Sequence, residues 1–141
     1  MSLSRINEIE EALKSRIESV DGLSGRSFIG QYSSPQVHPR AEIYAESVDF
    51  TDYTINGRGM EANLRFKVVL WYVSASAKEG YEEMKRLVWG IYDALMSERS
   101  MGLETDVRVT PNTFRMESGI TADNKYGFRW EVSLSVLIPV I

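Results

Sequence analysis

The sequence has no cysteine, one histidine and four prolines among its 141 residues. Without cysteine there can be no disulfide and no thiolate chemistry, which fits a reducing compartment. The single histidine is His38. The chain has no G-x-S-x-G motif whose serine His38 could activate as a general base. Zinc sites need three or four His, Cys or carboxylate ligands at recognisable spacing, and the sequence has none. We therefore predict no catalytic, cofactor-binding or metal site, and no enzymatic activity.

Long apolar runs are also missing. No stretch of 18 or more apolar residues occurs, which predicts that no segment spans a membrane. The first 16 residues are charged and amphipathic and lack the apolar segment of a signal peptide. We expect a chain made in the cytoplasm, without a membrane partner.

Clustered positive charge is absent as well. The chain has 16 basic and 20 acidic residues and a net charge of −4. Its nearest approach to a basic cluster, Lys85-Arg86, adjoins Glu82 and Glu83. Because phosphate binding needs gathered Lys and Arg, the charge argues against nucleic acid as the main partner. An acidic surface would instead let DNA pass without binding it.

The residues that are present predict regular elements. Apolar residues three or four apart predict a helix over about residues 4–20. A loop rich in glycine, serine and proline follows, with a short edge strand at about residues 28–32. Ser76 and Glu79 form a capping box that begins a second helix, to about residue 99. Its predicted core stripe is Tyr81, Met84, Val88, Ile91 and Leu95.

A long β-hairpin is predicted over about residues 41–73. Two alternating segments, 41–50 and 61–73, flank the turn signal Asn56-Gly57. Val48 is out of step with Ala45, which predicts a bulge near Ser47. The core face of the second segment carries Leu64, Phe66, Val68, Leu70 and Tyr72.

The last third is β again, at about residues 104–139. Short strands are expected at 104–109 and 113–117, then a polar loop at 118–125 and a long alternating final strand. The whole predicts a single α+β domain, residues 1–141. It has a mostly antiparallel sheet with a projecting hairpin, packed by an N-terminal helix and one long central helix.

The second hairpin strand is apolar on both faces near its end, since Val69, Trp71 and Val73 join the core face. Such a strand is either covered on both sides within the chain or meets another subunit. We favour a partner, and predict that Trp71→Ala loses assembly while the monomer stays folded. The candidate interface adds the hairpin tip and the polar loop: Val69, Trp71, Val73, Tyr53, Ile55, Arg58, Lys125 and Tyr126.

Two motifs have simpler explanations. The segment 57–62 matches the G-x-G-x-x-A form of the dinucleotide fingerprint but leads into a strand instead of a helix, so it is read as a hairpin turn. Asp52, Thr54 and Asn56 resemble the start of a calcium loop, yet Asn63 stands where a bidentate Glu is needed. The three tryptophans could stack on bases, but the acidic surroundings favour protein contacts.

Several segments together resemble the tail terminator and tail completion proteins of long-tailed bacteriophages and related particles. They are Pro39–Tyr44 entering the first long strand, Ser47–Phe50 ending it, Phe66–Val73 leading into the helix with Tyr92–Leu95, and Met101–Leu103 before the next strand. The likeness spans nearly the whole chain.

This resemblance implies a non-enzymatic ring, a homohexamer, that caps the tail tube, ends its growth and joins the tail to the head-side connector protein. It implies a place at the neck end of the virion tail, with DNA only passing through the lumen. Another connector or neck component stays open within this class. A different class also stays open: a small α+β ligand-binding domain or enzyme with a pocket between helices and sheet. Loop carboxylates such as Asp49, Asp52, Glu117 and Asp123 would supply its acid–base groups.

Overall fold

The computed structural model describes residues 3–30, 37–52, 60–103, 105–109 and 115–140, and contains two helices and six strands. In chain order they are α1 (Leu3–Glu18), β1 (Ser27–Ile29), β2 (Arg40–Asp52), β3 (Met60–Ser74), α2 (Ala77–Ser97), β4 (Asp106–Val109), β5 (Arg115–Ile120) and β6 (Tyr126–Val140). The α+β class predicted from the sequence is confirmed.

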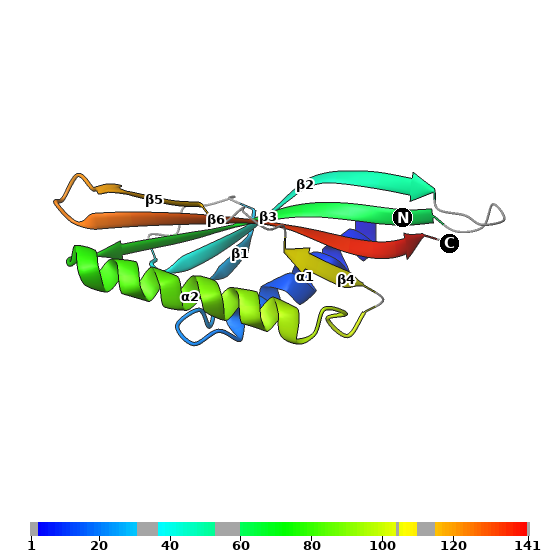
Figure 1. The fold of residues 1–141 in the computed structure, drawn as a ribbon, viewed down its shortest axis with the longest axis horizontal. Helices are drawn as coiled ribbons and strands as arrows, with labels where there is room; N and C mark the ends of the chain where they lie inside the picture. The colour runs from blue at the N-terminus through cyan, green and yellow to red at the C-terminus, as the bar shows by residue number, and fades with distance from the viewer. Residues whose placement is uncertain (1–2, 31–36, 53–59, 104, 110–114, 141) are drawn as a thin grey trace.

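All six strands belong to one sheet: five follow the order β1-β2-β3-β6-β4, and β5 pairs with β6 off this path (Figure 1). β1 pairs with β2 in parallel, and every other pair is antiparallel. β5 and β4 pair with successive lengths of β6: β5 with residues 126–131 and β4 with residues 134–137. The sheet therefore has β1 along one side and β5 with β4 along the other.

The hairpin of β2 and β3 is the longest feature of the sheet. Its register runs from Arg40 opposite Trp71 to Asp52 opposite Met60. The register shifts between Ala45 and Ser47, so the predicted bulge is confirmed, with Glu46 as the extra residue. The hairpin tip, with Tyr53, Ile55 and Arg58, lies outside the described residues.

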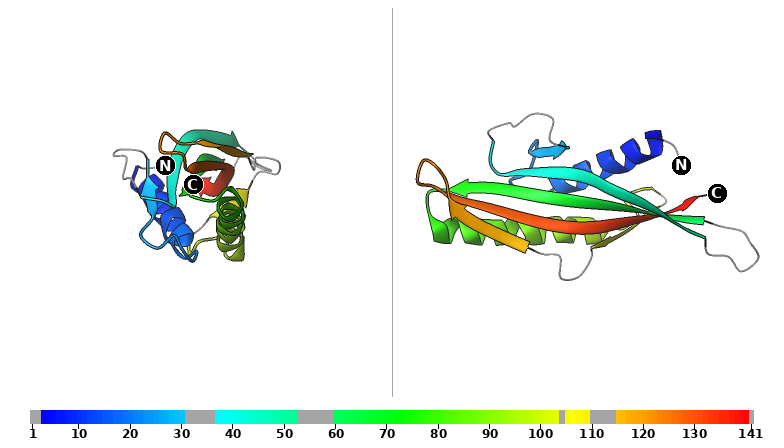
Figure 2. Two further views of the ribbon diagram at one scale, coloured as in Figure 1. Left: turned by 90° about the vertical axis from the view of Figure 1, so that its left-hand side faces the viewer. Right: turned by 90° about the horizontal axis from the view of Figure 1, so that it is seen from above.

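Both helices cover the same face of this sheet (Figures 1 and 2). α1 packs on β1 and β2, α2 packs on β3, β6 and β4, and the helices touch each other. The apolar residues of the two helices and of the facing strand positions form one core, which includes the predicted positions Ile9, Leu13, Ile17, Leu64, Phe66, Val68, Leu70, Met84, Val88, Ile91 and Leu95. Within the described residues no helix covers the opposite face of the sheet, which we call the open face.

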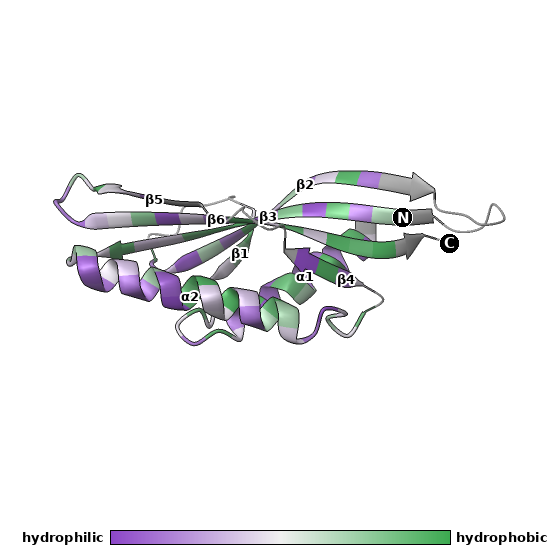
Figure 3. Cartoon of the chain, viewed as in Figure 1, coloured by the Kyte–Doolittle hydropathy of each residue, from purple (hydrophilic) through white to green (hydrophobic). Residues whose placement is uncertain are grey.

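The start of α2 follows the predicted capping box. Ser76 is the N-cap, and its Oγ accepts a hydrogen bond of 3.3 Å from the main-chain N–H of Glu79. The prediction for Tyr81 was wrong: this side chain is 42% exposed, whereas Gly80 and Leu87 lie on the buried side. Figure 3 shows the resulting alternation of hydrophilic and hydrophobic residues along α2.

The C-terminal strands differ from the prediction at one place. Residues 118–120 belong to β5 instead of the expected polar loop, and only residues 121–125 connect β5 to β6. No described helix is long and apolar enough to cross a membrane.

Candidate subunit interface

Trp71 lies on the open face, near the C-terminal end of β3, between two arginines. Its register partners in the adjacent strands are Arg40 of β2 and Arg129 of β6. The guanidinium carbons lie 5.4 Å and 5.3 Å from the centre of the indole ring. Both are within cation–π range, so the half-buried Trp71 is held from two sides by charged neighbours.

Val69 is in the next row of the same face and is only 2% exposed. Its register partners are Glu42 of β2 and Glu131 of β6. The side chains of these two residues, and the aliphatic parts of Arg40 and Arg129, lie alongside Val69. Long charged side chains commonly cover small apolar residues in this way. Val69 is therefore buried within the chain although no helix lies over it.

The charges of this face neutralise one another across the strands. Arg40 Nε lies 3.7 Å from Glu42, and Tyr44 donates a 2.9 Å hydrogen bond to the same carboxylate. Burial and this hydrogen bond raise the pKa of Tyr44 to about 12. The open face is thus polar and internally paired beside its few apolar residues.

Lys67 joins the outer carboxylates of this network. Its Nζ lies 3.1 Å from Glu131 and 3.6 Å from Glu46, and Arg129 also donates to Glu131 at 3.0 Å. Burial opposes ionisation of Glu131, but the hydrogen bonds from Lys67 and Arg129 outweigh it and lower its pKa. Glu131 therefore links β6 to β3 as a carboxylate.

A hollow of about 420 Å³ adjoins Trp71 at the end of the open face. Gly127 and Gly119 stand opposite each other in its lining, next to Val73 of β3. His38 lines one side, and burial, together with the charge of Arg40, lowers its pKa. Among the described residues, no hydrogen bond or ion pair links His38 to Glu117, the carboxylate of the hollow.

The same region holds no cation site. No group of three or more His, Asp or Glu side chains that could hold a metal ion occurs among the described residues. Among the described residues of the hollow, His38 and Glu117 do not form an acid–base pair.

The connection from β5 to β6 forms a rigid, exposed end, here called the hairpin end (residues 120–126). Thr121 organises it: its N–H bonds to the carbonyl of Lys125 at 2.8 Å, and its hydroxyl lies 2.6 Å from Asp123. The Thr121 hydroxyl hydrogen bond lowers the pKa of Asp123. Ile120 is 73% exposed on this end and its register partner Tyr126 is 38% exposed.

One flank of α2 carries exposed aromatic residues. Trp89 is 54% exposed and meets Tyr92 edge to face at 5.9 Å, and Lys85 stacks over Tyr81 at 4.6 Å. The segment that follows α1 contacts another part of α2: Val20 lies next to Gly90, and Arg86 donates a hydrogen bond to the carbonyl of Asp21. At 100° per residue, Gly90 lies about 180° around α2 from Tyr81, whereas Arg86 and Trp89 are only about 60° apart.

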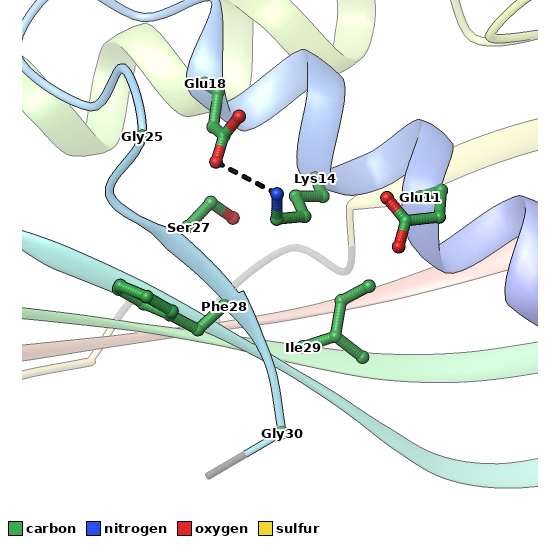
Figure 4. A pocket seen from close by; sticks show the side chains of 8 residues that line it. All are labelled: Glu11, Lys14, Glu18, Gly25, Ser27, Phe28, Ile29 and Gly30. Atoms are coloured by element: carbon green, nitrogen blue, oxygen red, sulfur yellow. Dashed lines mark ion pairs between the residues drawn. The ribbon is translucent and has the colours of Figure 1, made fainter. Parts of the chain in front are cut away.

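A groove of about 440 Å³ lies between α1 and β1, at the edge of the sheet opposite to β4 and β5 (Figure 4). It is lined by Glu11, Lys14 and Glu18 of α1 and by residues 27–30 of the strand, with a 3.3 Å ion pair between Lys14 and Glu18. Ser27 is 2% exposed, and its hydroxyl, drawn toward Lys14, has no hydrogen-bond partner in the described structure. We call it the α1–β1 groove.

The structure separates the predicted interface residues into two groups. Val69, Trp71 and Val73 lie on the open face, Val69 wholly buried, and Lys125 and Tyr126 lie at the hairpin end. Tyr53, Ile55 and Arg58 fall outside the described residues, and the interface itself stays a prediction.

The sequence analysis missed Ile120 and the α1–β1 groove. The one signal that could have indicated Ile120 was its position as a single apolar residue inside a polar segment.

Comparison with known proteins gives a fold relationship only. No family model matches the sequence, and no curated protein matches it. Among solved structures, the chain is similar to a chain from the virion of a native gene transfer agent (GTA) particle. The two share a fold with a TM-score of 0.56 over 91% of this chain and 93% of the other, at 12% sequence identity.

Proposed function

We propose that this chain is a structural, non-enzymatic protein of a phage-like virion, and that it acts as a tail terminator. In this function several copies form a ring, a hexamer, that caps the tail tube, ends its growth and joins the tail to the head-side connector. DNA only passes through the lumen. The observation that carries the proposal is the near full-length fold similarity to a chain of a gene transfer agent virion.

Two features of the molecule support this assignment. Among the described side chains of the open face, Arg40, Lys67 and Arg129 each face a carboxylate, so these charges are paired instead of forming a basic patch for DNA. Exposed aromatic and aliphatic residues on α2 and at the hairpin end offer the kind of surface that protein partners cover.

The test is the solution mass of the full chain, measured by sedimentation over a range of concentrations, with and without tail tubes. The tubes come from the tail tube protein of the same particle, identified from the neighbouring reading frames. We expect rings in electron micrographs, binding at tube ends and shorter tubes when the chain is added during tube growth. A chain that stays monomeric and never binds tubes contradicts the proposal.

A further inference from the structure

We propose that the hairpin end of one copy binds in the α1–β1 groove of a second copy, head to tail. This inference rests on the ring assembly proposed above and names the two surfaces that would form it.

The hairpin end and the α1–β1 groove lie at opposite edges of one sheet. β1 is the first strand of the sheet order, and the hairpin end belongs to β5 and β6 at the other side. A contact between two different surfaces of identical chains is heterologous, and repeating it generates a ring when the rotation closes. Surfaces on opposite sides of the subunit are what such a repeat requires.

The apolar parts of the two surfaces match. Ile120 is the most exposed large apolar side chain among the described residues, at 73%, and Tyr126 stands beside it at 38%. The groove offers the half-buried side chains of Phe28 and Ile29. Burying these four side chains against each other removes apolar surface from water in both copies.

The charges match as well. Lys125 at the hairpin end is 54% exposed, and its ion pair with Asp123 is long, at 3.7 Å. Glu11, Lys14 and Glu18 line the groove, and Lys14 already pairs with Glu18 at 3.3 Å. Glu11 is exposed and forms no ion pair within residues 3–30 and the other described ranges. A lysine entering this groove meets a carboxylate that is free to bind it.

Both surfaces are already in a binding shape. The hydrogen bonds of Thr121 fix the hairpin end, so little order has to be gained on association. In the groove, β1 bonds to β2 through the carbonyl of Arg26 and the N–H of Gly30. In a parallel ladder the main-chain groups of Ile29, which is half-buried, then point away from β2, where a partner can reach them.

The experiment compares Ile120→Asp with Ala122→Asp, which places the same charge in the same exposed turn. Because both side chains are exposed, both variants should keep the circular dichroism and melting temperature of the wild type. We expect Ile120→Asp to raise the concentration for half-assembly at least roughly 30-fold, as loss of an interface anchor does. Ala122→Asp should change it by less than about threefold.

A mixing experiment tests the head-to-tail geometry. Glu11→Arg blocks the groove by size and charge, and Ile120→Asp disables the hairpin end, so each variant alone should be monomeric. Mixed together they retain one intact contact, and we expect a one-to-one pair that does not grow into a ring. A chain carrying both Glu11→Arg and Lys125→Glu should recover part of the lost assembly.

The outcomes separate this inference from the proposed function. If the wild type forms rings and Ile120→Asp forms them equally well, the contact is wrong and the ring function stands. If the mixed variants form no pair, the head-to-tail geometry is wrong. A wild-type chain that never associates contradicts both.

Discussion

The ring of Phe128 lies directly over Gly80, at the point where the first turn of α2 meets β6. A Cβ added at Gly80 would overlap the edge of this ring and would stand 2.9 Å from Cβ of Ser74. Gly80 is buried, so neither neighbour can move into solvent. The close approach of helix and sheet here depends on the missing side chain.

We therefore expect Gly80→Ala to lower the free energy of unfolding by about 1–3 kcal/mol, the usual cost of overpacking. Alanine is the better helix former by ~1 kcal/mol, so a helix effect alone would have the opposite sign. Chemical denaturation measures the difference. Gly119→Ala is the control, because nothing lies within 4 Å of its added Cβ. Equal or greater stability of Gly80→Ala would show that the Phe128 ring can move aside.

The contact between α2 and the turn that follows α1 gives a second prediction. A Cβ at Gly90 would stand 2.8 Å from Cγ1 of Val20. Gly90→Ala alone should destabilise the protein by about 1 kcal/mol or more. With Val20→Ala the space opens, so the double variant should be more stable than the sum of the two single changes predicts. Strict additivity in denaturation would mean that the two residues do not share this space.

Trp71→Ala tests the open face. The variant loses two cation–π contacts and should lose about 1–2 kcal/mol of stability while still folding, since Trp71 is outside the buried core cluster. We expect loss of assembly into rings or onto tubes, measured by sedimentation, and retention of both in Trp71→Phe. A Trp71→Ala chain that unfolds would show that the indole is needed for the fold itself.

The carboxylate of Glu131 gives a pH prediction. Its pKa is lowered in the folded chain, so the unfolded chain binds more protons as the pH falls below the ordinary value of 4.5. The stabilisation by Lys67 and Arg129 is present above that value and disappears as Glu131 becomes protonated in the folded state. Glu131→Gln should therefore be less stable than wild type by about 1 kcal/mol at pH 7. Denaturation at several pH values should show this difference shrink below pH 4.5, and a constant difference would contradict the assignment.

The strands and helices were predictable because their signals are local. The alternation of β3 and β6, the capping box at Ser76 and the phase change at Ser47 each occupy a few successive residues. Tyr81 was misplaced for a related reason. Spacings of three and four select a helical stripe but not its centre, and Gly80, at the true centre, carries no apolar side chain to indicate it.

The open face could not be predicted from β3 alone. Val69 and Trp71 look like an apolar surface in the sequence, but their neighbours come from strands about 30 and 60 residues away. Only the register shows that Arg40 and Arg129 flank Trp71. The α1–β1 groove is missed for the same reason, since it forms between a helix and a strand that the sequence describes separately.

The bulge in β2 determines where this strand tolerates a change of length. Glu46 is the extra residue, and Ala45 and Ser47 face successive residues of β3, Phe66 and Arg65. Removing Glu46 would leave a regular ladder in which all the remaining side chains of β2 keep the faces they now occupy. The ion pair between Glu46 and Lys67 would be lost. Removing Ile43 instead would move the side chains on one side of the deletion to the opposite face of the sheet. Buried and exposed positions would then be exchanged. Natural or engineered relatives that lack one residue in this strand should therefore lack it at position 46.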